Sequence, residues 1–358
     1  MATLKAVQSG TATIAIGATS TTAAISSITT SKALLFFGFY HDEVSEGAGK
    51  GTTYGEITSA TQLSFSRLEG DASYPVNIVW RVVEWTSGVS TQRGSVNNID
   101  TTTNVTISSV NTAKSFALCN EKGGFNNGER GGEMPSCDIT SSTNLALVVG
   151  QSGNWNQTVA WQVAEYDNCT IQKITKTLTT GTSASDTITS VAMSKTFLDV
   201  TNRGDNGDFY QHYYWSMRLT AATTISYSRD YDTSFTTVFI TYVVGVTDTI
   251  LVQRGAETVS AGTGTKNITL GTTLTDYTKT WAWLTSPDFR DRAKAKTTNE
   301  TYEGRRRFAV GATSNTNLRF QRGDTNDEAE ASWELIELGG GGTRHNGFLP
   351  FFSRIAGR

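Results

Sequence analysis

Cysteine is scarce in this chain of 358 residues, which holds only Cys119, Cys137 and Cys169. Three cysteines, an odd number, do not make a disulfide framework, and the chain has no C-x-x-C pair of the kind that holds zinc. Cys119 and Cys137 bracket one long loop and could pair, which would stabilise the fold by roughly 3 kcal/mol. We favour the alternative that the cysteines are free thiols in a protein made in a reducing cytosol.

Charge and long apolar runs are also limited. Charged residues make up 18% of the chain and the net charge is −3, so no electrostatic footprint for nucleic acid is present. Without a run of about 18 apolar residues we expect no membrane span. The first residues lack the apolar core of a signal peptide. No segment of about twelve residues shows an apolar helical stripe with caps, so we expect little helix.

Residue combinations that carry chemistry are missing as well. None of the three histidines, His41, His212 and His345, has a partner at metal-ligand spacing. A serine or cysteine nucleophile would need one of them close by in space. Acidic loop residues such as Asp42 and Asp205 fit solvated loops better than calcium sites. We therefore predict no catalytic residue, no metal and no cofactor, and a protein that is not an enzyme.

What the chain has in abundance is repetition. One marker lies at Trp80, Trp161, Thr241 and Trp333, with spacings of 81, 80 and 92 residues. A second marker lies at Lys32, Lys114, Lys195 and Lys279, with spacings of 82, 81 and 84. Two markers that agree on one period predict four copies of a module of about 80 residues. Modules of that size bury only about 60% of their unfolded surface, so we expect them to lean on one another.

Each copy has the pattern of five or six short strands. Thr, Val, Ile and aromatic residues dominate, and these fit a pleated surface. Alternation has a period of two: Leu63 and Phe65 point one way, and Ser64 and Ser66 point the other way. Short strands with turn signals every 8–12 residues or so indicate a sandwich. The predicted fold class is all-β, with four tandem antiparallel β-sandwich modules.

The predicted modules span residues 1–85, 86–169, 170–247 and 248–338. No Pro- or Gly-rich linker separates them, which predicts fixed angles between modules. On the closing strand around residues 76–83 both faces carry apolar side chains, so that strand is buried on both sides or meets a neighbouring module. A buried Trp contributes several kcal/mol at about 25 cal/mol per Å². The predicted core anchors are therefore Trp80, Trp161 and Trp333.

Residues 339–358 differ from the modules. They open with four glycines and continue with large apolar side chains that are too few to form a core. Such residues would make an exposed apolar patch, so we expect the tail to dock on another subunit or on the last module. The candidate docking residues are Phe348, Leu349, Phe351, Phe352 and Ile355.

The long loops differ between copies whereas the strands match. They cover roughly residues 41–55, 121–136, 202–211 and 286–304. Binding residues often sit on loops held by a rigid frame, and aromatic side chains among Asn, Gly and Asp suit sugars or another protein. The alternative is that these aromatics pack over the ends of the sandwiches. The candidate contacts are Tyr54, Phe125, Trp155, Phe209, Tyr210, Phe289 and Tyr302.

Several motifs of the first copy resemble modules of tailed-bacteriophage virion proteins. They are Val-Gln-Ser-Gly-Thr-Ala-Thr-Ile from residue 7, Ser-Lys-Ala-Leu-Leu-Phe-Phe from residue 31, Leu-Ser-Phe-Ser-Arg from residue 63, and Val-Trp-Arg-Val-Val-Glu from residue 79. The resemblance implies a non-enzymatic structural component of a phage particle, assembled in the host cytoplasm. It would be a fibre, collar or tail-tip element that acts as rigid spacer and attachment module. Its partners would be other virion proteins and copies of itself.

The strand order and the late Trp are also similar to the H-type lectin sandwich, which typically assembles as a trimer. This likeness implies a homo-oligomer and an alternative function as a glycan-binding adhesin that recognises a host surface. A capsid decoration protein is a further alternative. The third copy departs from the pattern, since Thr241 and Gly245 stand where the other copies have Trp and Glu.

Overall fold

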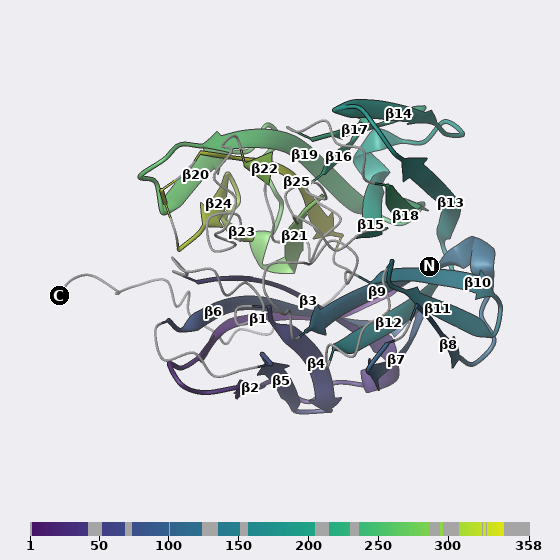
Figure 1. Ribbon diagram of the computed structural model, residues 1–358, viewed down its shortest axis with the longest axis horizontal. Coiled ribbons are helices and arrows are strands. Elements are labelled where there is room, and N and C mark those ends of the chain that lie inside the picture. The colour runs from purple at the N-terminus through teal and green to yellow at the C-terminus, as the bar shows by residue number, and fades with distance from the viewer. Residues whose placement is uncertain are drawn as a thin grey trace.

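The computed structural model describes residues 2–41, 52–68, 74–99, 101–123, 135–150, 157–204, 215–229, 236–285, 294–295, 308–323, 325–326 and 328–339. Within these ranges the chain is all-β, as predicted (Figure 1). Helical structure in them is confined to short 3₁₀ turns just before the third strand of each module. These turns are η1 (Thr30–Lys32), η3 (Thr112–Lys114), η4 (Met193–Lys195) and η6 (Tyr277–Lys279).

The first module shows the layout that the others repeat. Its strands are β1 (Thr3–Ile14), β2 (Ser20–Ala24), β3 (Ala33–Tyr40), β4 (Tyr54–Ser59), β5 (Gln62–Ser66) and β6 (Val76–Ser87). An inner sheet has the order β1-β6-β3 and an outer sheet has the order β2-β5-β4, with every pair antiparallel. The two sheets enclose a core that includes Ile14, Leu63 and Phe65. The module is therefore a small sandwich.

The second module consists of β7 (Val89–Asn97), β8 (Thr102–Thr106), β9 (Ser115–Lys122), β10 (Ser136–Ser141), β11 (Asn144–Val148) and β12 (Thr158–Tyr166). The third consists of β13 (Cys169–Leu178), β14 (Ser183–Thr187), β15 (Thr196–Gly204), β16 (Ser216–Ala221), β17 (Thr224–Ser228) and β18 (Thr237–Val246). The fourth consists of β19 (Ile250–Val259), β20 (Thr265–Thr269), β21 (Thr280–Leu284), β22 (Lys294–Ala295), β23 (Ala309–Ser314), β24 (Asn317–Gln321) and β25 (Ala329–Leu338). Their sheets repeat the strand orders of the first module, with β22 as an extra pairing on β25.

The closing strand of each module is buried on both faces, as its sequence predicts. In β6, Ile78 and Trp80 pack into the core of their own sandwich. Val83 and Trp85 point the other way and join a cluster that contains residues of all four modules. One strand thus connects the interior of its own module to the centre of the molecule.

The four modules surround this shared central cluster (Figure 1). In the first three modules the fourth strand, an edge strand, packs on the inner sheet of the next module: β4 on β9 and β12, β10 on β15 and β18, and β16 on β25. The same contact then returns from the fourth module to the first, where β23 packs on β3 and β6. The chain therefore closes into a ring. Tandem repeats by themselves do not predict this closure.

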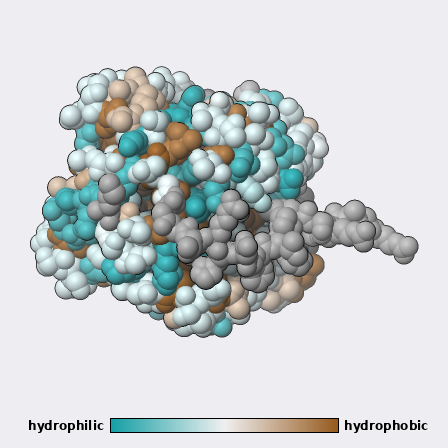
Figure 2. Space-filling view, turned by 180° about the vertical axis from the view of Figure 1, so that it is seen from behind, coloured by the Kyte–Doolittle hydropathy of each residue, from teal (hydrophilic) through white to brown (hydrophobic). Residues whose placement is uncertain are grey.

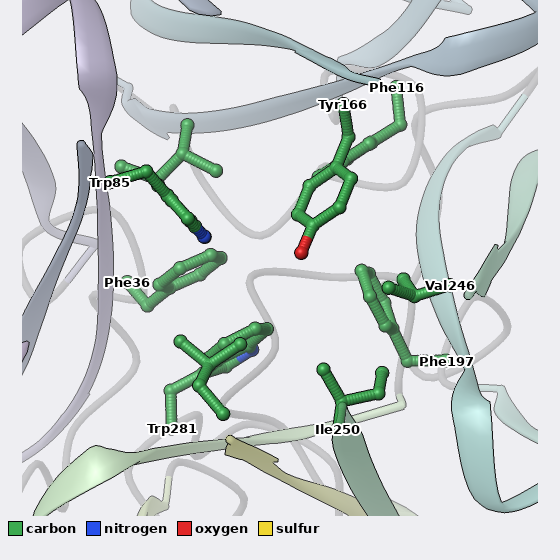
Figure 3. A pocket seen from close by; sticks show the side chains of 10 residues that line it. Phe36, Trp85, Phe116, Tyr166, Phe197, Val246, Ile250 and Trp281 are labelled. Atoms are coloured by element: carbon green, nitrogen blue, oxygen red, sulfur yellow. The ribbon is translucent and has the colours of Figure 1, made fainter. Parts of the chain in front are cut away.

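An aromatic contact joins the first and last modules at the centre. The ring of Phe36 stacks on the indole of Trp281, with centroids 4.9 Å apart and an interplanar angle of 2°. Figure 3 shows the residues around this point approaching from four sides, one side for each module. The ring is thus closed by packing where no connection along the chain exists.

Three of the four marker lysines bond to the connections between modules, whereas Lys279 pairs with Asp276 just before its own turn. Lys32 Nζ donates to Val89 O at 3.3 Å, Lys114 Nζ donates to Asp167 O, and Lys195 Nζ donates to Thr247 O at 3.4 Å. Each lysine ends the 3₁₀ turn before the third strand of its module. In the first three modules, the second sequence marker therefore ties that turn to the place where the chain passes into the next module.

The connections also bond to one another around one end of the ring. Asp167 N donates to Gly88 O at 2.9 Å, and Thr247 N donates to Asn168 O at 2.9 Å. At the start of the chain, Ala2 N donates to Asp248 Oδ2 at 3.0 Å. We call this side, where the chain passes from module to module, the connection end.

Candidate interaction end of the ring

The long loops leave each sandwich at the end away from the connections. In the first module β3 ends at Tyr40, which pairs with Asn77 near the start of β6. On the other sheet Tyr54, at the start of β4, pairs with Ser66, at the end of β5. Both the β3–β4 loop and the β5–β6 loop therefore begin and end at the same end of the module. We call this side the loop end.

Neighbouring modules are hydrogen-bonded to each other near the loop end. Gly55 N donates to Asn120 Oδ1 at 2.8 Å, and Asn120 Nδ2 donates back to Gly55 O at 3.2 Å. Cys137 N donates to Thr201 Oγ1 at 3.0 Å at the next interface. At the third interface Thr285 O accepts from Met217 N at 2.9 Å. The acceptor residues Asn120, Thr201 and Thr285 occupy the same position in the sequence repeat. The loop ends of adjacent modules are thereby fixed side by side.

Deeper in each interface, the residue after the first marker (Trp, or Thr241 in the third module) contacts a strand of the neighbouring module. Gln162 accepts from Leu35 N and donates to Leu35 O, both at 2.9 Å. Ile139 N donates to Tyr242 OH at 2.8 Å, and burial raises the pKa of that phenol. The same position has a different side chain in each module, so each interface has its own polar pairing.

The third and fourth modules are joined by a carboxylate at this position. Leu198 N donates to Glu334 Oε2 at 2.8 Å, while Arg254 Nε donates to Oε1 at 3.1 Å. Burial raises the pKa of Glu334, and Arg254 and the Leu198 amide oppose that shift. At the closing interface the position is Arg81, which lies against Gly311, and burial lowers its pKa to about 10.

Tyr54, a predicted loop contact, lies inside an interface between modules. Its side chain is only 5% exposed, and Lys122 Nζ sits 5.5 Å from the centre of its ring. Lys122 also donates to Ser66 Oγ at 3.1 Å. Burial raises the pKa of the Tyr54 hydroxyl, with a further contribution from Glu56. Tyr54 thus packs the base of its loop against the second module.

The other predicted interaction residues fall outside the described ranges. This holds for the loop candidates Phe125, Trp155, Phe209, Tyr210, Phe289 and Tyr302, and for the tail candidates Phe348, Leu349, Phe351, Phe352 and Ile355. The predicted core anchors are described. Trp80, Trp161 and Trp333 are 6–7% exposed and lie in hydrophobic clusters.

Three buried arginines at the loop bases were not singled out from the sequence. Each follows the middle strand of the outer sheet of its module, and its Nε donates to a carbonyl in the turn between the first two strands. The bonds are Arg67 to Ala18 at 2.9 Å, Arg229 to Gly181 at 2.9 Å and Arg322 to Thr263 at 3.0 Å. Their recurrence at one place in the repeat is the signal that could have found them.

Each of these guanidinium groups also lies over an aromatic ring at the base of a loop. Arg229 Cζ is 4.6 Å from the centre of the Trp215 ring, and Arg322 Cζ is 5.6 Å from that of Phe308. Arg67 lies over Tyr74 at 5.7 Å. Such cation–π contacts are stabilising, more so when desolvated. The arginines therefore fasten the loop bases to the turn between the first two strands, which lies at the same end of the sandwich.

The centre of the ring leaves almost no free space. Ten residues of the four modules surround a cavity of about 10 Å³ (Figure 3). A cavity of that size has room for about one water molecule. Its lining is apolar except for the hydroxyl of Tyr166 and the indole nitrogens of Trp85 and Trp281. Burial is the main reason that the pKa of this hydroxyl is raised. The centre is therefore a packed core and not a ligand pocket.

The described residues hold little that points to reaction chemistry. Among them, no group of three or more His, Cys, Asp or Glu side chains lies close enough together to hold a metal ion. Cys119, Cys137 and Cys169 are free thiols. None of the described helical segments is long and apolar enough to cross a membrane. The face shown in Figure 2 mixes separate hydrophobic areas with hydrophilic and intermediate residues.

In comparisons with known proteins, no protein-family model matches this chain, and no curated protein matches its sequence.

Proposed function

We propose that the chain is a non-catalytic structural and attachment protein of a tailed-phage particle. In this role the ring is a rigid platform, the loop end faces outward, and the connection end faces the particle. The assignment to a particle comes from the resemblance of the first module's motifs to virion modules. The geometry contributes the orientation and the division of roles between the two ends.

One observation carries the proposal: neighbouring modules are bonded to each other at the loop end itself. The Gly55–Asn120, Cys137–Thr201 and Met217–Thr285 contacts recur at matching places in successive interfaces. A frame of this kind holds variable loops at fixed mutual positions, which is the arrangement expected of a binding surface built on loops. The matching strands supply rigidity, and the differing loops supply contacts.

The exit point of the tail supports the same orientation. Gly339 N donates to Thr249 O at 2.7 Å, so the described part of the chain ends at the connection end, and residues 340–358 follow it in the sequence. Their apolar side chains suit a partner that buries them. In this proposal the tail joins the ring to a neighbouring virion subunit, on the side away from the loops.

The test is the location of the chain in particles of a phage that encodes it. Mass spectrometry of purified particles should find the chain in several copies per particle. Gold-labelled antibodies against segments of the loop end should bind intact particles, whereas antibodies against Asp167–Asn168 at the connection end should not. Absence of the chain from purified particles would reject the proposal, and the opposite pattern of labelling would reject the orientation.

Host glycans are the alternative partner of the loop end. A glycan array with the purified chain distinguishes a sugar-binding adhesin from a structural module. Binding that is lost when the β9–β10 loop is replaced by a Gly-Ser linker of equal length would place the sugar contact at the loop end. Binding that survives replacement of each loop in turn would place it elsewhere.

A further inference from the structure

Two cysteines of the second module occupy facing positions across the interior of its sandwich. Cys119 lies on β9 of the inner sheet and Cys137 lies on β10 of the outer sheet, and the two strands pack on each other. Cys137 is fully buried, whereas Cys119 is partly exposed. Burial raises the pKa of the Cys137 thiol, and the nearby Cys119 thiol contributes to the same shift.

The sequence repeat gives a second view of this geometry. The matching positions in the first module are Phe37 and Gly55. A Cβ added to Gly55 would lie only 2.7 Å from Phe37 Cε1, so the two positions meet directly across the sandwich. In the third module the same places hold Val200 and Met217, which belong to one hydrophobic cluster. The second module therefore puts two thiols where the others put a pair of packed apolar groups.

We propose that Cys119 and Cys137 are a redox-active pair that closes into a disulfide joining the two sheets of the second module. The bond would also close off the long β9–β10 loop, because the two residues stand on either side of it. This inference does not depend on the proposed function, since it concerns a modification of the chain itself.

The order of events follows from exposure. Cys119 is the thiol that an external oxidant reaches. Its Sγ donates to Pro135 O at 3.6 Å. Its thiolate attacks a low-molecular-weight disulfide such as oxidised glutathione, forming a mixed disulfide and releasing one glutathione thiolate. Cys137 then loses its proton, attacks the Cys119 sulfur and releases the second glutathione. Two protein thiols are oxidised by two electrons, and one glutathione disulfide is reduced to two thiols.

Cys169 provides an internal control. It is also buried, and burial raises its pKa to about 12. Its Sγ donates to Lys114 O at 3.4 Å at the junction of the second and third modules. Unlike Cys137, it has no cysteine among the groups that act on its thiol, so it should stay reduced under conditions that oxidise the pair.

The experiment starts from the reduced full-length chain, which is incubated with oxidised glutathione at about pH 8, denatured and alkylated. The expected product has lost the mass of two hydrogen atoms, is alkylated only at Cys169, and yields a cross-linked peptide of Cys119 with Cys137. Its thermal midpoint should rise by about 5 °C over the reduced form. Recovery of three alkylated cysteines after prolonged oxidation would overturn the proposal.

Two variants separate a resolving pair from two unrelated thiols. In Cys137→Ser the attack stops after its first step, so glutathione should remain attached to Cys119. In Cys169→Ser the disulfide should form as in the parent chain. A stable glutathione adduct on Cys119 in the parent chain would show that Cys137 does not resolve it, and the proposal would fail.

Discussion

The indole of Trp80 lies directly over Gly10 on the adjoining strand, so that a Cβ added to the glycine would fall 2.5 Å from Cζ2 of the ring. The second and fourth modules repeat this relationship between opposite residues, Gly94 with Trp161 and Gly255 with Trp333. The third module has Ile174 opposite Thr241. The side-chain volumes on the two strands are therefore complementary. Modules with the large Trp have Gly opposite it, and the module with the smaller Thr has the larger Ile opposite it.

Gly10→Ala is expected to destabilise the first module, because the new methyl group cannot share the space of the indole. Overpacking of this kind typically costs about 1–3 kcal/mol. Chemical denaturation should show the loss as a lower midpoint. Gly271→Ala is the matched control, since a Cβ there would meet no atom within 4 Å. Equal effects of the two substitutions would contradict the packing argument.

The third module also predicts how this strain can be relieved. Gly10→Ile alone should be strongly destabilising, and Trp80→Thr alone should cost about 3–5 kcal/mol through loss of a buried ring. The double variant copies the Ile174–Thr241 pair and should lose less stability than the sum of the two single changes. A double-mutant cycle measures this coupling. If the losses of stability were additive, the residues at the two positions would not compensate for each other's size.

The repeat and its all-β character could be predicted because the Trp and Lys markers recur at one period and apolar residues alternate. The role of Trp80 as a core residue also follows from its size and its position on an alternating strand. The sequence does not show how the third module compensates for having Thr241 in place of the marker Trp. The residue opposite Thr241 in the strand pairing is Ile174.

Closure of the ring and the interface contacts could not be predicted from the same patterns. Gln162 has no feature that marks it as a partner of Leu35, 127 residues away. The position occupied by Gln162 carries Arg81, Tyr242 and Glu334 in the other modules. A comparison of the four copies therefore does not mark it as an interface position. Contacts between distant segments depend on how whole modules pack, and period and alternation describe only the strands within one module.

Gln162→Ala should weaken the interface of the first two modules by about 1–3 kcal/mol, because Leu35 N and O would be left buried without their partner. Gln92→Ala is a close control. Gln92 makes the same two kinds of bond, to Ser108 N and O, but within one module and at an exposed place. Its loss should cost less, since water replaces the amide. Denaturation midpoints of the two variants compare the costs, and a larger effect at Gln92 would contradict the interface assignment.

Glu334→Gln should change the pH dependence of stability. Burial raises the pKa of Glu334 in the folded chain above its ordinary 4.5. Its protonated form is therefore favoured by folding, and the stability that it contributes below pH 4.5 is lost as the pH rises through the folded value. Glutamine, which the second module has at this position, keeps an acceptor for Leu198 N and does not titrate.

The free energy of unfolding, measured for both proteins at about pH 4 and about pH 7, gives the comparison. The variant should gain relative to the parent chain as the pH rises. A difference that stays constant, or that moves in favour of the parent chain, would show that the Arg254 contact outweighs burial of the carboxyl group.

The last prediction concerns the shared centre. Phe197 belongs to the third module but packs in the central cluster, where its ring makes edge contacts with Phe116 at 5.8 Å and Trp281 at 6.0 Å. Phe239 is also buried in the third module, but it packs in that module's own cluster. Alanine at either place should cost about 3–5 kcal/mol. The two losses should differ in how far they spread.

Hydrogen exchange measured strand by strand reveals that spread. In Phe197→Ala, exchange should accelerate in the inner strands of all four modules, because each contributes side chains to the same cluster. In Phe239→Ala, the increase should be greatest in β15–β18 and smaller elsewhere. If Phe197→Ala loosened only the third module, the four sandwiches would be independent units that merely touch. The central cluster would then not be what keeps the ring together.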